Sequence, residues 1–263
     1  MSRFILIIIL CSIVNLLPAQ FNRLVWSDEF EGEASIPDSL KWGYDIGDGC
    51  PDNCGWGNRQ LEYYTDKPAN ARIENGLLII EAHRMPTHGH QYSSARIHTR
   101  KSASWDKGRI EVRARLPRGR GVWPAIWMLP EKWHYGGWPH SGEIDIMEHV
   151  GWAPDSIFGT VHTLNYNHVN GTQKGRTTYL PDLSLHFHNY GIIWTERKID
   201  FLIDDQIFFT YEDDGRGSGS WPFDQKFYLI LNIAVGGNFG GVKGVDETVW
   251  PQRMEVDYVR IYQ

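Results

Sequence analysis

The sequence lacks the features of several common protein classes. Lysine and arginine form no block, and 26 basic residues against 32 acidic ones give a net charge of −6, which argues against nucleic acid as a partner. No Pro/Ser-rich linker, repeat or low-complexity tract divides the chain, so we expect one domain over residues 20–263. No segment sustains a helical period of apolar residues, which disfavours a helical fold.

The most continuous apolar run lies at the N-terminus. Residues 1–3 are a short basic start, residues 4–10 are apolar, and residues 16–19 read Leu-Leu-Pro-Ala. This pattern is typical of a secretory signal peptide over residues 1–19, cleaved after Ala19. An uncleaved membrane anchor is the alternative, although the strictly apolar part is short for a spanning helix. We therefore expect a secreted monomer, extracellular or periplasmic, that has no membrane contact after cleavage.

Cysteine is scarce, with three residues in the chain, and Cys11 falls within the expected signal peptide. Cys50 and Cys54 remain as a close pair. In an exported protein this pair favours a disulfide that closes a small loop, and two free thiols are the alternative. A metal site at the pair is disfavoured, because two thiols without a nearby histidine supply too few ligands.

The chain is rich in short strand patterns and in aromatic residues. Residues 108–116 alternate between apolar and charged side chains, as a strand with one buried face does. Comparable runs lie at 76–80, 190–194, 199–203, 207–209, 227–235 and 254–262. Turn residues separate them, which predicts an all-β fold, either a two-sheet sandwich or a barrel. The 12 Trp and 12 Tyr residues suit a core, but such rings also form platforms for sugars.

Three carboxylates fall within residues 143–148, Glu-Ile-Asp-Ile-Met-Glu, in an otherwise apolar segment. On a strand, Glu143 and Asp145 share one face, whereas Glu148 has the wrong parity and would point to the apolar side. One extra residue restores the parity, so the spacing predicts a β-bulge, and we assign Met147 as the extra residue. All three acids then lie in a row on one polar face.

Two carboxyl groups that flank a glycosidic bond are the standard apparatus of glycoside hydrolysis. We assign Glu143 as the nucleophile, Glu148 as the acid/base, and Asp145 as the residue between them that hydrogen-bonds to the nucleophile. A negative Glu143 would raise the pKa of Glu148 and keep it protonated as the reaction begins. A solvated acidic strand or a calcium site is the alternative, since carboxylates also gather around Ca²⁺.

The same strand carries a family resemblance. Residues 143–148 fit the pattern Glu-x-Asp-x-x-Glu, and further matching motifs lie at residues 26–30, 55–58, 94–96, 121–130, 159–163 and 231–238. Over residues 21–263 the sequence resembles glycoside hydrolase family 16, specifically its laminarinase-like branch of endo-β-1,3-glucanases. Lichenases and plant xyloglucan transglycosylases of that family have a pattern one residue shorter, so the bulge separates this chain from both.

The resemblance implies a β-jelly-roll sandwich of two antiparallel sheets with a concave substrate cleft. It also implies a secreted retaining endo-β-1,3-glucanase that hydrolyses laminarin-like β-glucans and needs no cofactor for catalysis. The substrate-binding residues expected on this basis are Asn58, Arg96, Trp123, Trp127, Trp138, His162 and Asn238. For the tryptophans the alternative is ordinary packing, for Arg96 a surface charge, and for His162 a structural role.

The family also often holds a structural Ca²⁺ away from the cleft. Glu29, the backbone oxygen of Gly76 and Asp257 match those ligand positions, and ordinary turn and strand acids are the alternative. One departure from the family follows Asn58. Where relatives commonly have Glu and then, two residues on, Gln, this chain has Gln60 and Glu62. If either side chain meets sugar, preference near the nonreducing end would differ.

Two other functions share these features. The first is a hydrolase of the same fold that acts on mixed-linkage glucan, agarose, porphyran or carrageenan. Sulfated polymers usually call for a basic cleft, and the negative net charge does not support one. The second is a β-glucan-binding protein without activity. Such proteins typically lose catalytic carboxylates, whereas all three are present here.

Overall fold

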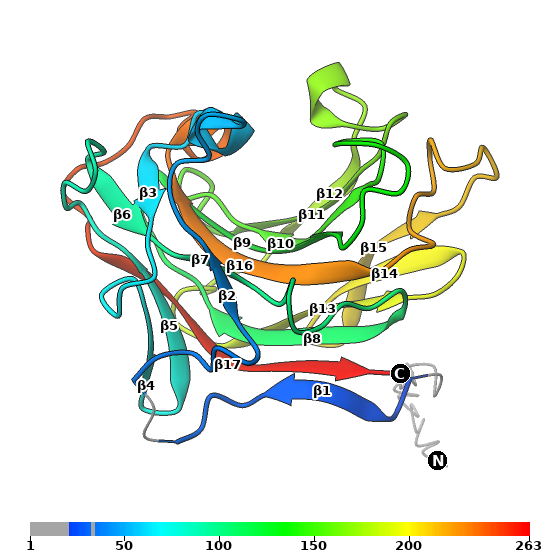
Figure 1. The fold of residues 1–263 in the computed structure, drawn as a ribbon, viewed down its shortest axis with the longest axis horizontal. Coiled ribbons are helices and arrows are strands. Elements are labelled where there is room, and N and C mark those ends of the chain that lie inside the picture. The colour runs from blue at the N-terminus through cyan, green and yellow to red at the C-terminus, as the bar shows by residue number, and fades with distance from the viewer. Residues whose placement is uncertain (1–20, 33–34) are drawn as a thin grey trace, which may run out of the picture.

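The computed structural model describes residues 21–32 and 35–263, so the expected signal peptide lies outside the described residues. Two antiparallel sheets pack face to face, and a small parallel strand pair flanks them (Figure 1). The prediction of an all-β jelly-roll sandwich is confirmed. In the part of the chain that the structure describes, no helix has the length and apolar character needed to cross a membrane.

The lower sheet in Figure 1, which we call the outer sheet, has the order β15-β14-β13-β8-β17-β5-β4, with β1 also paired to β17. Its strands are β1 (Leu24–Asp28), β4 (Ala71–Glu74), β5 (Leu77–Ala82), β8 (Gly108–Arg115), β13 (His188–Trp194), β14 (Lys198–Ile203), β15 (Gln206–Glu212) and β17 (Gln252–Tyr262). Each strand run predicted from the sequence overlaps an observed strand. The matching strands are β5, β8, β13, β14, β15 and β17 of this sheet and β16 of the other sheet.

The upper sheet, which we call the cleft sheet, is curved and has the order β12-β11-β10-β9-β16-β7-β2 (Figure 1). Its strands are β2 (Gly43–Asp45), β7 (Arg96–His98), β9 (Val122–Pro130), β10 (Glu143–Glu148), β11 (Ser156–His162), β12 (Lys174–Tyr179) and β16 (Phe227–Val235). The remaining elements are β3 (Glu62–Tyr64), β6 (Tyr92–Ser94), the short helices η1 (Cys54–Gly57) and η2 (His168–Asn170), and α1 (Gly237–Gly240). The loops with η1 and η2 rise on opposite sides of the cleft sheet.

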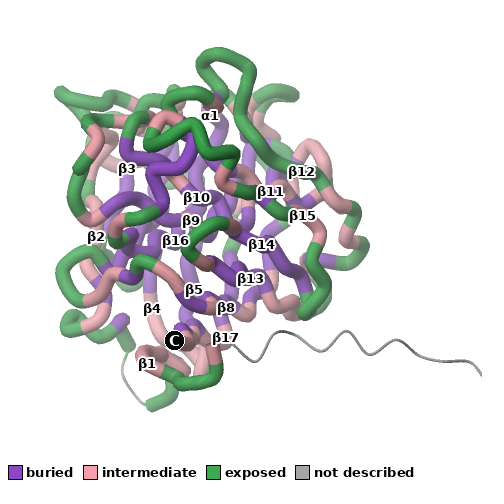
Figure 2. The backbone as a smooth tube through the Cα atoms, turned by 90° about the vertical axis from the view of Figure 1, so that its right-hand side faces the viewer, coloured by how far each residue is buried: buried purple, intermediate pink, exposed green. Residues whose placement is uncertain are grey.

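The core lies between the two sheets, and β16 shows how alternation builds it. All nine residues of β16 are buried. Leu229, Leu231 and Ile233 join the main core cluster, whereas Tyr228 and Ile230 pack with Leu129 and Trp127 in a separate cluster. Successive side chains of a strand point to opposite faces, so one run of residues fills the core and also builds the floor of the concave face. Figure 2 shows this buried interior and the exposed edge strand β12.

The predicted bulge is present in β10. Against β11, Asp145 pairs with Thr160 and Glu148 with Phe158, so β10 has one residue more than its partner. Against β9 the shift falls between Asp145 and Met147, which leaves Ile146 without a partner. The assignment of Met147 as the extra residue is therefore wrong by one position.

The physical reason lies in packing. Ile146 and Met147 are 1% and 0% exposed, and both belong to the core cluster. Two successive side chains thus enter the core instead of one, which turns Glu148 back to the same face as Glu143 and Asp145.

Shortening the Met147 side chain, which belongs to the bulge and is buried in the core, should destabilise the protein. We expect Met147→Ala to lower the free energy of unfolding by about 2–5 kcal/mol, because the buried side chain leaves a cavity. Urea denaturation measures the change, and Val242→Ala, at a position 60% exposed, serves as the matched control. A loss below about 0.5 kcal/mol, the range of surface substitutions, would contradict the role of Met147 in the core.

Candidate active site

A cleft runs across the concave face of the cleft sheet. Two adjoining cavities of about 470 and 480 Å³ occupy it, and both are lined by Glu143, Glu148, Trp123, Asn58 and His168. The first cavity extends toward β12, and the second extends toward the loop that carries η1. The acidic strand therefore lies in the middle of the cleft, with space for substrate on both sides.

Each glutamate of β10 accepts a hydrogen bond from an indole. Trp138 Nε1 donates to Glu143 Oε2 over 2.8 Å, and Trp123 Nε1 donates to Glu148 Oε1 over 3.0 Å. Trp123 lies on β9, whereas Trp138 comes from the loop that precedes β10. A donor aimed at a carboxylate fixes its orientation and favours its charged form. Two of the three tryptophans that the sequence placed in the cleft, Trp123 and Trp138, thus each donate a hydrogen bond to an acid, whereas Trp127 donates to Asn232.

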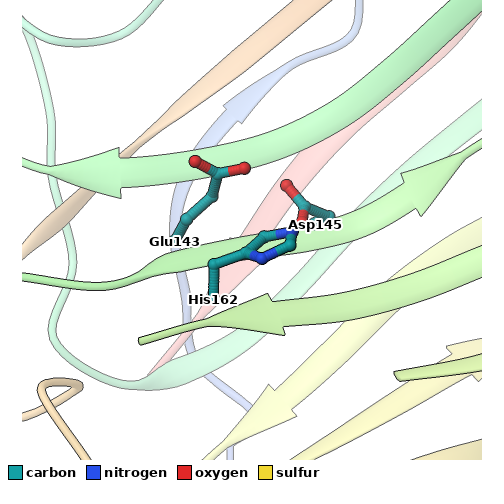
Figure 3. A group of neighbouring side chains, drawn as sticks. All are labelled: Glu143, Asp145 and His162. Atoms are coloured by element: carbon teal, nitrogen blue, oxygen red, sulfur yellow. Dashed lines mark ion pairs between the residues drawn. The ribbon is translucent and has the colours of Figure 1, made fainter. Parts of the chain in front are cut away.

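Asp145 lies between the two glutamates and faces His162 of β11 (Figure 3). His162 Nε2 is 3.2 Å from Asp145 Oδ2, and both residues are buried. Ligand-type atoms of Glu143, Asp145 and His162 all lie within 4.8 Å of one another. The imidazole of His162 therefore lies next to two of the three acids.

Burial raises the pKa of all three acids. For Glu143 the pKa rises to about 8, with the charge of Asp145 as the next cause. For Glu148 burial raises the pKa to about 7, while His162 and the Trp123 hydrogen bond act to lower it. The pKa of Asp145 lies well above its ordinary value because of burial and the charge of Glu148. The cluster therefore holds protons at neutral pH, as acid catalysis requires.

Arg96 has a different environment from the one expected of a residue that only contacts substrate. Its guanidinium carbon lies 4.4 Å from the ring centroid of Trp56 and 4.8 Å from that of Trp127, and its Nε is 2.9 Å from Asp45 Oδ2. The residue is 8% exposed and lines the second cavity. Arg96 thus joins two aromatic platforms, since a guanidinium stacks well between indole rings.

Some residues of the second cavity were not assigned from the sequence. Asn232 Oδ1 accepts from Trp127 Nε1 over 2.7 Å, and Asn232 Nδ2 donates to the Tyr64 hydroxyl over 3.0 Å. The signal was a polar residue inside the apolar run of β16. Trp56 also lines this cavity, within a motif from which only Asn58 was selected. Asn238, which was predicted, lines the first cavity.

The loop that presents Trp56 is shaped by glycine and by a disulfide. Cys50 and Cys54 are joined, as predicted. Trp56 has a φ of 53° and is flanked by Gly55 and Gly57, whose φ values are 60° and 74°. A Cβ at Gly57 would lie 2.6 Å from the Asn53 side chain, so this left-handed turn requires glycine.

The carboxylates of the expected calcium ligands already have cationic partners. Glu29 accepts hydrogen bonds of 3.1 and 2.8 Å from Arg260, and Asp257 pairs with Arg113. Gly76 occupies the turn between β4 and β5 with a φ of 75°. This arrangement fits two ion pairs better than an oxygen cage for Ca²⁺. Calcium stays a prediction, and no chemistry is assigned to it.

Comparison with known proteins identifies the family and the fold. A family model described as "Glycosyl hydrolases family 16" matches residues 53–260. The chain belongs to this family. A β-glucanase of Rhodothermus marinus is 50% identical over 249 residues, which cover 92% of this chain and 85% of that protein.

Two solved structures are similar to nearly the whole chain. The laminarinase from Rhodothermus marinus has a TM-score of 0.89 at 49% identity, over 93% of this chain and 98% of that one. A mutant of a non-specific endo-β-1,3(4)-glucanase has a TM-score of 0.87 at 43% identity, over 94% and 96%, and presents a 1,3-β-D-cellobiosyl-glucose at its active site. The chain is accordingly a family 16 glycoside hydrolase.

The raised pKa of Glu148 makes the stability of this family 16 enzyme depend on pH. The pKa is about 7 in the folded protein against an ordinary 4.5, so the stability linked to this group is fully present below pH 4.5 and is lost as the pH rises to about 7. A side chain at position 148 that cannot ionise would not show this loss of stability with rising pH. At about 1.4 kcal/mol per pKa unit, we expect Glu148→Gln to raise the free energy of unfolding by about 1–3 kcal/mol at pH 8.

Urea denaturation at pH 4 and pH 8 measures this effect, and at pH 4 the variant and the unmodified protein should unfold alike. Glu196→Gln provides a control, because the Glu196 side chain is 81% exposed. An equal effect of Glu148→Gln at both pH values would contradict the link to ionisation.

Proposed function

We propose that the protein is a secreted, retaining endo-β-1,3-glucanase that hydrolyses laminarin-like β-glucans by double displacement. The observation that carries the proposal is the row of Glu143, Asp145 and Glu148 on the floor of a cleft open on both sides. The relatives described above are named laminarinase, β-glucanase and endo-β-1,3(4)-glucanase, which supports a glucan substrate. Cavities on both sides of the acids suit cleavage within a chain.

In the first step the Glu143 carboxylate attacks the anomeric carbon, and Glu148 donates its proton to the leaving oxygen as the glycosidic bond breaks. Glu143 must be ionised for this. The indole N–H of Trp138 favours its charged form, whereas burial and the charge of Asp145 oppose it. The positive charge that develops at the anomeric carbon favours the ionised nucleophile further.

In the second step the roles of the carboxyl groups change. Formation of the covalent glycosyl–enzyme removes the charge of Glu143, so the pKa of Glu148 falls and its carboxylate can accept a proton from water. The water oxygen then attacks the anomeric carbon and displaces Glu143. Two successive inversions give net retention of configuration.

Aromatic residues of the second cavity supply the binding platform. Trp56, Trp127, Trp133 and Trp138 line it together, and flat rings of this kind stack on the apolar faces of sugars. Asn58, Asn238 and His162 add polar groups along the first cavity. The N-terminal pattern over residues 1–19 and the disulfide in the cleft loop support export, since disulfides persist in oxidising compartments.

Substitution of either glutamate tests the chemistry. We expect Glu143→Gln or Glu148→Gln to lower kcat on laminarin by at least about 1000-fold, because each removes a group that acts on the reacting bond. Release of reducing sugar measures the rate, and circular dichroism verifies that the variants fold. Turnover by either variant within about tenfold of the unmodified enzyme would refute its assignment.

A product profile on laminarin, lichenan, agarose and carrageenan tests the polymer. We expect oligosaccharides of mixed length from laminarin, weaker release from lichenan, and none from agarose or carrageenan. Mixed-linkage glucan is the second candidate substrate, because one structural relative is described as non-specific for β-1,3(4) linkages. Faster release from agarose or carrageenan than from laminarin would overturn the proposed substrate.

A further inference from the structure

Glu62 is a buried acid outside the catalytic row. It lies on β3, is 0% exposed, and is one of the two positions at which the sequence departs from its family. Its Oε2 accepts a hydrogen bond of 2.7 Å from the backbone N–H of Val235, and its Oε1 is buried without a hydrogen-bond partner among the described residues. The sugar-binding surface therefore does not include Glu62, and its carboxyl acts on the backbone of another element.

Val235 is the last residue of β16, and the segment after it lines the cleft. The backbone N–H of Leu61 donates to the carbonyl oxygen of Val235 over 3.0 Å. Residues 61 and 62 therefore bind both the N–H and the C=O of Val235. Gln60 and Gly236 form an isolated antiparallel β-bridge. The backbone N–H of Asn238 donates to the carbonyl oxygen of Asn58 over 2.7 Å. Two loops from distant parts of the sequence are thus joined along their length.

The joined loops approach each other too closely for side chains at the glycines. A Cβ at Gly237, where φ is 72°, would lie 2.8 Å from Asn58 O and 3.3 Å from the Trp123 ring. Asn58 and Asn238 both line the first cavity beside Glu148. Small displacement of either loop therefore changes the position of two cleft residues next to the acid/base.

Glu62 also lies beside a series of hydrogen bonds that leads to Trp127 on the cleft floor. Tyr64, its neighbour on the same face of β3, donates to Gln60 Oε1 over 3.3 Å and accepts from Asn232, which in turn holds the Trp127 indole. The ionisable groups that face Glu62 are Tyr64 and Arg96. The Glu62 carboxyl thus contacts the loop after β16 and lies next to Tyr64 and Arg96.

We propose that Glu62 is a positioning residue of the substrate cleft, whose carboxyl oxygen joins the loop that carries Asn58 to the loop that carries Asn238. The inference rests on the proposed function, because its effect is read as substrate affinity. Glu62 touches no reacting atom, so its loss changes where the cleft residues lie rather than the chemical step. Burial raises the pKa of Glu62 to about 7, which gives a second, independent readout.

Three variants test the inference on laminarin. We expect Glu62→Ala, which removes the acceptor, to raise KM about tenfold with kcat within about twofold, the scale of one lost buried hydrogen bond. Glu62→Gln keeps an oxygen acceptor for the Val235 N–H and should hold KM within about twofold of the unmodified enzyme. Asp200→Ala is the structural control, because it removes an acid of β14 that is 2% exposed and has two hydrogen bonds. It should lower Tm without a change in KM.

The pH dependence separates the charge of Glu62 from its hydrogen bond. A folded pKa of about 7 against an ordinary 4.5 means that stability linked to Glu62 is present below pH 4.5 and is lost as the pH rises to about 7. Glu62→Gln should therefore melt at a higher temperature than the unmodified enzyme at pH 8 and at the same temperature at pH 4. If Glu62→Ala does not fold, Glu62→Met fills the space without an acceptor and replaces it.

Amide hydrogen exchange gives a readout that needs no substrate. Exchange at residues 235–240 should be faster in Glu62→Ala and unchanged in Glu62→Gln. A KM change in Glu62→Ala no larger than in Asp200→Ala, or unchanged exchange at 235–240, overturns the inference. If the unmodified enzyme does not cleave laminarin while the exchange difference is present, the proposed function fails and the link between the loops stands.

Discussion

The burial of two successive side chains, Ile146 and Met147, is the constraint on which the site depends. Both side chains are buried in the apolar interior between the sheets, where an unpaired polar or charged side chain would be costly. Because both side chains turn inward, the strand gains a residue and Glu148 emerges on the cleft face. Core packing thus fixes the position of an acid that never touches the core. The positions of the three acids are therefore set by the packing of the side chains beneath them in the core.

Those acids repel one another, and the surroundings offset the repulsion from three directions. An indole of β9 holds Glu148, an indole of the loop before β10 holds Glu143, and an imidazole of β11 faces Asp145. Each of these three rings comes from a different element, so no single segment can form the site. The pKa values of the two glutamates are raised, chiefly by burial and further by the neighbouring acids. Retained protons are the result, and a proton is what the departing oxygen needs.

The sequence predicted the elements whose signal is local. Alternation located β8, β16 and β17, and counting parity along residues 143–148 located the bulge. Parity shows only that one residue is added, so the choice between Ile146 and Met147 required the partner strands. The environment of Arg96 was beyond prediction for a related reason. Its contact with Trp56 depends on a left-handed loop conformation and on β7 and β9 lying under the same loop.

Glu62 illustrates the limit of reading one position at a time. The sequence left open whether its side chain meets sugar, and the structure buries it against the backbone of Val235, 173 positions away. A cleft of this kind has no single recognition segment. Alternation in β9 and β16 builds the core with one set of side chains and the cleft floor with the other, and loops near residues 58 and 238 line the cleft beside that floor. The positions of the cleft residues therefore depend on backbone contacts between loops as well as on the strands that carry them, and the proposed role of Glu62 follows from this arrangement.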